Sequence, residues 1–322
     1  MDRYKRVSKR WRDALSKTKE YEVVESEYVY DAEVSPVDSY VAVDEYQHAL
    51  QVKKELLKRY AGKKLVEVIP GKEIENDAGN CYYIVHEQEL TLNTIDASCA
   101  RQMIISELKL LRGVGRVSEE RLKGEGYLTI EDLKDHPRFG AEARRCLEII
   151  DQGDMPQLIG WLVHWLPKSH PLVLFASGLH RVEDFLVVDI ESMGIFTRPI
   201  ILFGVAQLSN NKINVHQYFV RNIMEEPAAL VGFLSHVNER TAFVTFNGRT
   251  FDIPYIKERL AYYGIDGDLE RPHFDALHFS RRLFGEYVPN CRLATLEKFL
   301  FSTVREKDIP SALVPEFYEK YL

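Results

Sequence analysis

The strongest constraint on the fold is a series of hydrophobic strand candidates in the second half of the chain. Three of them follow one another closely, and an amphipathic helix, a short strand and further helices come next. This order predicts a mixed sheet with helices packed on it. The expected strands cover residues 185–190, 200–206, 213–220 and 242–246, and the expected helices cover residues 225–237, 253–263, 275–284 and 293–301.

Two acidic residues stand at the end of the first of these strands. Side chains alternate along a strand, so Asp189 and Glu191 point to the same face. A divalent cation between them would relieve their repulsion. The plainer interpretation is a strand that runs out into solvent, and the spacing alone leaves both interpretations open.

A third acidic residue follows the short strand that ends near residue 246. Asp252 closes the run Asn247-Gly248-Arg249-Thr250-Phe251-Asp252 and falls in the first turn of the next helix. The helix dipole favours an anion there, and an ordinary N-terminal carboxylate has the same position. Taken alone, Asp252 therefore does not distinguish a metal ligand from a common helix feature.

Together the three acids resemble the DEDD-type three-prime to five-prime exonucleases of the ribonuclease H-like superfamily. Asp189-Ile190-Glu191 looks like the first exonuclease motif and residues 247–252 look like the second. The likeness covers about residues 171–322. It is strongest to a family of prokaryotic ribonuclease H-like proteins, which typically continue with a His-x-Asp run and an aliphatic-rich helix. Here these are His273-Phe274-Asp275 and residues 293–297, and the run 308–315 is also similar.

The resemblance implies an α/β fold, a ribonuclease H-like mixed sheet flanked by helices, and a metal-dependent exonuclease that hydrolyses phosphodiester bonds of DNA or RNA. Two divalent cations, Mg²⁺ or Mn²⁺, would be held by Asp189, Glu191 and Asp252. The resemblance makes Asp189 the bridging ligand and Glu191 a ligand that also orients the water or the terminal nucleotide. It gives Asp252 the second metal, partly through water.

The sequence departs from the superfamily pattern at its C-terminal end. The superfamily has a fourth acid on a late helix, and no Tyr-x-x-x-Asp or His-x-x-x-x-Asp run follows residue 293. We therefore expect a domain without its last helix. Its site would be impaired, or the chain would be a non-catalytic nucleic-acid-binding module. Glu316 and Glu319 are conceivable substitutes, although nearby terminal carboxylates are usually a solvated face.

Two further residues lie near the second motif. His273 and Asp275 could support the metal ligands or contact substrate. The alternative is that Asp275 caps the next helix and His273 is a structural neighbour. Asn247, in the second motif, is predicted to contact nucleic acid.

A second nucleic-acid signal lies upstream. Leu110-Leu111-Arg112-Gly113-Val114-Gly115 resembles the turn of a helix-hairpin-helix motif, and another helix is expected to begin at Thr129. Such a turn presents backbone N–H groups to a phosphate, and Arg112 and Arg116 would add salt-dependent attraction. The motif grips duplex backbone more often than RNA, which favours DNA. The alternatives are a turn that packs on a neighbouring domain and a protein contact surface.

These patterns divide the chain of 322 residues into four expected parts. They are an N-terminal α+β region (1–99), a helix-hairpin-helix region (100–155), a linker (156–170) and the exonuclease domain (171–322). In the first part we expect strands at residues 28–30, 40–43 and 81–85 and a helix at 46–60. This part is the natural contact surface for a protein partner.

Composition limits the remaining choices. The chain carries 42 Lys+Arg against 49 Asp+Glu, a formal charge of −7, which argues against a nucleic-acid-binding surface over the whole protein but allows local basic patches. No apolar run approaches the roughly 20 residues that span a bilayer. The four cysteines form no CxxC pair. We therefore expect a cytoplasmic protein with reduced thiols and no membrane contact.

Overall fold

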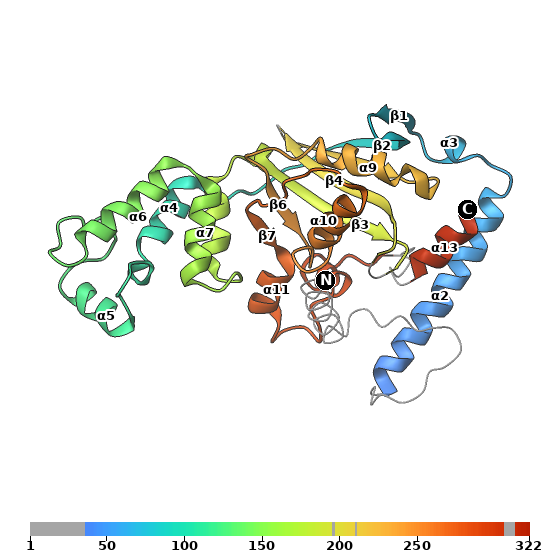
Figure 1. The fold of residues 1–322 in the computed structure, drawn as a ribbon. Coiled ribbons are helices and arrows are strands. Elements are labelled where there is room, and N and C mark those ends of the chain that lie inside the picture. Colours follow the sequence, from blue (N-terminus) through green and yellow to red (C-terminus); the bar gives the residue numbers. More distant parts are fainter. Residues whose placement is uncertain (1–35, 195–196, 210, 306–312) are drawn as a thin grey trace, which may run out of the picture. The chain divides into compact units, whose positions relative to one another are not determined.

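The computed structural model describes residues 36–194, 197–209, 211–305 and 313–322, and Figure 1 shows its elements. Internal contacts divide the chain into two units. Unit 1 consists of Met1–Pro70, Glu191–Pro199 and Arg292–Leu322, and unit 2 consists of Gly71–Ile190 and Ile200–Cys291. The boundaries expected at residues 99, 155 and 170 stay predictions.

One mixed sheet, formed by seven strands of the described residues, confirms the predicted fold class. Its strand order is β1-β2-β5-β4-β3-β6-β7. The pairs β1–β2, β2–β5 and β4–β5 are antiparallel, and β3–β6 and β6–β7 are parallel. The strands are β1 (Lys72–Asn76), β2 (Gly79–Glu89), β3 (Phe185–Ser192), β4 (Ile200–Ser209), β5 (Lys212–Phe219), β6 (Ala242–Thr245) and β7 (His273–Asp275).

Strands from distant parts of the sequence share this sheet. Tyr82 of β2 pairs with Phe219 of β5, and Glu89 pairs with Lys212 at the other end of the same ladder. The first two strands therefore extend the sheet built by residues 185–275, although a long helical segment separates them in sequence.

The core of the sheet is explained by strand alternation. On β3, Leu186 and Val188 are buried in a cluster with Phe233 of α9, whereas Phe185 packs against a second cluster that includes Phe274. Helices α9 and α10 contribute apolar side chains to the first cluster, and α11 and the upstream helices contribute to the second. The elements are η4 (Ile223–Glu225), α9 (Glu226–Leu234), α10 (Asp252–Tyr263) and α11 (Ala276–Phe284).

The upstream helices of unit 2 form the segment that we call the helical region, residues 97–165. The helix expected from Thr129 is wrong, because residues 129–135 form turns. Thr129 and Asp132 satisfy each other's backbone N–H groups at 2.8 and 3.3 Å, so the capping signal closes a turn without a helix. The elements are α4 (Ala97–Ile105), η1 (Leu108–Leu110), α5 (Arg116–Gly124), α6 (Gly140–Gln152) and α7 (Met155–Trp165), followed by α8 (Pro171–Phe175), η2 (Ala176–Leu179) and η3 (Val182–Asp184).

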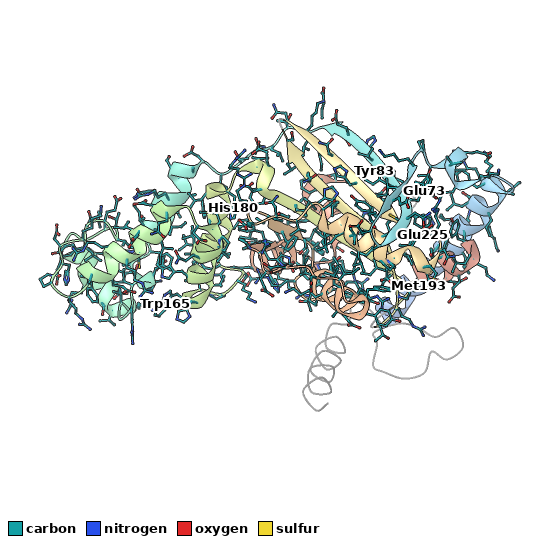
Figure 2. All side chains as sticks on the ribbon, turned by 45° about the horizontal axis from the view of Figure 1, so that its top comes forward. Glu73, Tyr83, Trp165, His180, Met193 and Glu225 are labelled. Atoms are coloured by element: carbon teal, nitrogen blue, oxygen red, sulfur yellow. The ribbon has the colours of Figure 1, made fainter. Side chains whose placement is uncertain are left out.

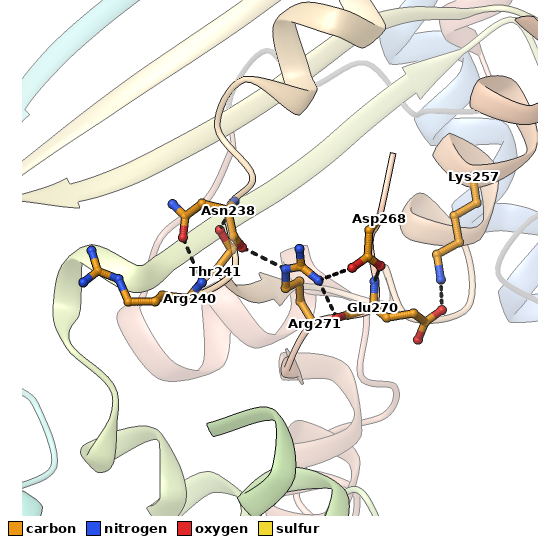
Figure 3. A network of polar contacts seen from close by, with 7 residues as sticks. All are labelled: Asn238, Arg240, Thr241, Lys257, Asp268, Glu270 and Arg271. Atoms are coloured by element: carbon orange, nitrogen blue, oxygen red, sulfur yellow. Dashed lines mark hydrogen bonds and ion pairs between the residues drawn. The ribbon is translucent and has the colours of Figure 1, made fainter. Parts of the chain in front are cut away.

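The loop between α10 and β7 is tied to the entry of β6. Arg271 donates from Nε to the carbonyl of Asn238 at 2.8 Å and from Nη1 to Asp268 at 2.7 Å (Figure 3). Lys257 of α10 pairs with Glu270 in the same loop. These contacts hold β7 beside β6, and β7 carries two of the candidate site residues.

Unit 1 contains helices from both ends of the chain. Lys53 pairs with Glu316, and its ammonium lies 4.9 Å from the ring centroid of Phe317. The expected strand at residues 40–43 is wrong, since it lies inside α2, where the long helix overrides weak strand propensity. Residues 28–30 lie outside the described residues. The helices are α2 (Pro36–Tyr60), α3 (Leu65–Val68), α12 (Leu293–Phe301) and α13 (Val314–Tyr321).

Across the ranges that the structure describes, none of the helices has the length and apolar character needed to cross a bilayer.

Candidate active site

The second motif forms a tight connection from β6 into α10. Asn247 adopts a positive φ of 67°, a conformation that asparagine tolerates better than most residues. At Gly248 a Cβ would lie 2.5 Å from the Cβ of Thr245, so only glycine fits there. The chain then turns at once into α10, whose first residue is Asp252.

Asp252 joins the two acidic motifs. Its side chain is buried, at 5% exposure, and Oδ1 accepts a hydrogen bond from the backbone N–H of Ile190 at 3.0 Å. Ile190 stands between Asp189 and Glu191 on β3. Two motifs about sixty residues apart in the sequence are thus held together by one buried bond.

The electrostatics of Asp252 shows what this placement costs. The pKa of Asp252 is raised to about 8. Burial is the largest cause and the nearby negative charge of Asp189 adds to it, whereas the hydrogen bond from Ile190 opposes the rise. The charged form of Asp252 is therefore unfavourable beside Asp189 at neutral pH. A hard cation with oxygen ligands would reverse this balance, so the pair fits a divalent metal.

The described residues do not include three or more His, Cys, Asp or Glu side chains arranged to hold a metal ion. The acids whose charges act on Asp252 are Asp189 and, more weakly, Asp275. Glu191 lies two residues farther along β3, is half-buried and belongs by its contacts to unit 1. Its place as a third ligand rests on the alternation of side chains along the strand.

Asp275 anchors the second motif from β7. It is 2% exposed and accepts the backbone N–H groups of Asn247 at 2.8 Å, Arg249 at 3.0 Å and Leu277 at 3.1 Å. The last of these bonds makes Asp275 the N-cap of α11. Its carboxylate is thus used to fix the loop that leads to Asp252.

His273, at the start of the same strand β7, is held as a neutral side chain. Its Nε2 lies 2.7 Å from Oγ1 of Thr245, and its carbonyl accepts a bond from the guanidinium of Arg249. Burial, followed by the charge of Arg249, lowers the pKa of His273 to about 3. These contacts support its role as a structural neighbour of the second motif.

Sequence reasoning missed Arg249 and two basic residues close enough to feel its charge, Lys168 and His278. Burial lowers the pKa of Arg249, and burial together with the charge of Arg249 lowers the pKa of Lys168. His278 has a lowered pKa for the same reasons, opposed by Asp275, whose Oδ2 lies 3.9 Å from its Nε2. Arg249 stands inside the second motif and could have been found, whereas Lys168 lies in the predicted linker and has no local signal.

The predicted helix-hairpin-helix residues lie where η1 leads into α5. Gly113 adopts a φ of 84°, which requires glycine, and Gly115 is the N-cap of α5. Arg116 begins that helix and forms an exposed ion pair with Glu120 at 3.1 Å, while Arg112 is exposed. The geometry leaves the N-terminus of α5 open, and its contact with nucleic acid stays a prediction.

Comparison with known proteins matches the second half of the chain to a protein family. Residues 186–322 match the family model described as the RNase_H superfamily. The chain is similar to the uncharacterized protein YprB of Bacillus subtilis strain 168, with 34% identity over 163 residues, which is 49% of this chain and 39% of that protein. It is also similar to DNA polymerase III PolC-type of Ureaplasma parvum serovar 3, with 28% identity over 156 residues, which is 40% of this chain and 11% of that protein. The chain thus spans well under half of either curated relative.

Proposed function

We propose, taking residues 186–322 as a domain of the RNase_H superfamily, that this chain is a metal-dependent nuclease with three-prime to five-prime exonuclease action on DNA or RNA. The observation that carries the proposal is the bond from the N–H of Ile190 to Asp252. It places a buried carboxylate beside Asp189, at a charge cost that a divalent cation would offset.

The proposed ligands are Asp189, Glu191 and Asp252. Mg²⁺ or Mn²⁺ ions held there would stabilise negative charge on the phosphodiester and lower the pKa of a water molecule, as such ions do in related nucleases. Asp252 is fixed by the backbone of β3, so it keeps its position when a ligand binds. Asp275 holds the loop before α10 and so keeps Asp252 at the end of that loop.

The positive groups around Arg249 fit the charge of the substrate. Burial lowers the pKa of Arg249, Lys168 and His278, and the positive charge of Arg249 lowers the pKa of Lys168 and His278 further. A phosphate would relieve that repulsion in the same way that a cation relieves the repulsion between the acids. We assign these three residues to the phosphate groups of the strand.

The helical region supplies the second part of the proposal. Gly113 and Gly115 shape the entry into α5, where backbone N–H groups would bind a phosphate of the nucleic acid. Arg112 and Arg116 add attraction that falls with salt. We assign Asn247 to contact with the nucleic-acid strand near Asp189 and Asp252. DNA is favoured because such turns usually grip duplex backbone.

The first experiment is titration with Mn²⁺ followed by calorimetry, on the wild-type chain and on Asp189→Asn. We expect saturable binding by the wild type and its loss in the variant. Asp266→Asn is the matched control, because Asp266 is an exposed aspartate without an ion pair or side-chain hydrogen bond among the described residues. Equal Mn²⁺ binding by wild type and Asp189→Asn would refute the assignment of the site.

The second experiment tests cleavage and its direction. Oligonucleotides labelled at one end or the other, single-stranded or duplex, are incubated with Mg²⁺ or Mn²⁺. Progressive shortening from the three-prime end, absent in Asp189→Asn, is the expected result. Retained nucleic-acid binding with metal bound and no cleavage would favour the non-catalytic module instead.

A further inference from the structure

A pocket of about 180 Å³ lies between α6 and α7 in the helical region. Residues 142–149 of α6 form one wall, residues 161–165 of α7 form the other, and Arg112 reaches it from the turn before α5. An apolar cavity of about 150 Å³ is enough to hold a benzene ring. This pocket therefore has room for one flat aromatic ring system.

Aromatic side chains line the α7 wall. Trp161 is half-buried and packs on the apolar core, and Trp165 lies in the last turn of α7 with 39% of its surface exposed (Figure 2). The ring of His164 meets Trp165 edge-on, with ring centroids 4.9 Å apart and an interplanar angle of 88°. An exposed indole of this kind gives a flat ligand a surface on which to stack.

Unpaired cations flank the same pocket. Arg112 and Arg145 are exposed, and among the described residues neither makes an ion pair or a side-chain hydrogen bond. Several other basic residues of the helical region are paired: Arg101 with Glu131 and Asp151, Lys123 with Glu119, and Arg144 with Asp135. Glu142 is the acid in the lining, and two guanidiniums outweigh it. The pocket rim thus favours an anion.

We propose that this pocket binds one unpaired nucleobase of a single strand, stacked on Trp165, with its neighbouring phosphates on Arg112 and Arg145. Stacking aromatics beside free guanidiniums are the combination that single-strand sites use. The inference rests on the proposed function only in taking nucleic acid as the ligand, and it needs neither metal nor cleavage. Arg112 also belongs to the turn before α5, so one strand would run from the pocket to that helix.

The test uses a single-stranded DNA oligonucleotide with one 2-aminopurine, in EDTA, so that cleavage does not occur. We expect the wild type to bind it with quenching of the 2-aminopurine fluorescence. Trp165→Ala should weaken binding about tenfold and abolish the quenching, because stacking on one aromatic ring accounts for a loss of this size. Trp165→Phe, which keeps a flat ring and guards against misfolding, should recover part of both.

Two matched controls separate the base from the phosphates. The same oligonucleotide with an abasic site in place of 2-aminopurine should bind about as weakly to wild type as the intact one binds to Trp165→Ala. Arg145→Ala should weaken binding and flatten its salt dependence, whereas Arg144→Ala, its neighbour on α6, should leave both unchanged. Equal affinity of wild type for the intact and abasic strands would overturn the proposal.

The outcome is distinguishable from the fate of the nuclease proposal. Quenching that depends on Trp165 in a protein that never cleaves would support the pocket and refute the nuclease. Cleavage by the wild type with unchanged binding by Trp165→Ala would do the reverse.

Discussion

We call Asp189, Asp252 and Asp275, at the ends of β3 and β7 and the start of α10, the acidic edge of the sheet. This acidic edge and the basic pocket of the helical region hold their ionisable side chains in opposite ways. Asp252 and Asp275 are buried, and backbone N–H groups bind both carboxylates. Arg112 and Arg145 are exposed and make no such contact among the described residues. The first arrangement fixes the position of a carboxyl group, and the second leaves a guanidinium free to follow a ligand.

The difference has a thermodynamic cause. A buried carboxylate loses its hydration and must regain the free energy through hydrogen bonds or a cation, which is why the pKa of Asp252 rises to about 8. An exposed guanidinium keeps its water and costs little, but salt screens its attraction. The fixed carboxyl groups of the acidic edge therefore suit a reaction that needs a defined geometry. The exposed arginines of the helical region suit binding of an anion that weakens as salt rises.

The largest expected effect comes from neutralising the buried acid. Asp252→Asn should lower cleavage about 1000-fold, because a bound metal ion contributes several kcal/mol of charge stabilisation. The amide oxygen can still accept from Ile190, and the repulsion with Asp189 is gone. The variant should therefore be at least as stable as wild type, which thermal unfolding beside the cleavage assay checks. A variant that cleaves normally would show that Asp252 is only a structural carboxylate.

The next effect tests whether the backbone bonds hold the acidic edge in place. Asp275→Ala leaves the N–H groups of Asn247, Arg249 and Leu277 without their acceptor, and we expect a loss of about 3 kcal/mol in the free energy of unfolding. Asp154→Ala is the control, because Asp154 is an exposed cap with one such bond, to Gln157. It should cost about 1 kcal/mol in the same urea titration. Equal losses would contradict the importance of burial.

The sequence anticipates the parts of this arrangement that are local. The hydrophobic run at residues 185–190 predicts β3, and the run Asn247–Asp252 predicts the entry into α10, because both depend on near neighbours. The pairing of β2 with β5 and the two bonds from Asn247 and Arg249 to Asp275 join residues far apart, and no local pattern encodes them. At Thr129 a genuine capping signal closed a turn, since the residues after it did not continue as a helix.

A smaller effect is expected in the helical region. Arg112→Ala should reduce nucleic-acid affinity a few-fold at low salt and lower the slope of log affinity against log salt by about 1, the value for one phosphate contact. Binding measured at several salt concentrations gives that slope. Arg116→Ala provides the comparison, since Arg116 already pairs with Glu120 and should change the slope less. An unaltered slope in Arg112→Ala would remove this residue from the interface.

The smallest effect concerns a buried polar group without bonds. His180 is 9% exposed, packs against Phe185 and Phe274 with ring centroids 5.5 and 5.4 Å away, and neither ring nitrogen has a hydrogen-bond partner within the described part of the chain (Figure 2). Burial lowers the pKa of His180 to about 4. It thus lacks the bonds that make burial tolerable for Asp275, and its replacement by phenylalanine should be stabilising.

We expect His180→Phe to gain about 1 kcal/mol at pH 7, because the unpaired ring nitrogens are removed. The gain should grow as pH falls. Between the unfolded pKa near 6.5 and the folded pKa near 4, the unfolded histidine binds a proton that the folded one does not, so the wild type loses stability through this window. Urea unfolding at pH 7, 6 and 5 measures the difference. A constant or shrinking gain would mean that His180 has a hydrogen-bond partner in solution. Burial of a polar side chain would then depend on hydrogen bonds for His180 as it does for Asp275.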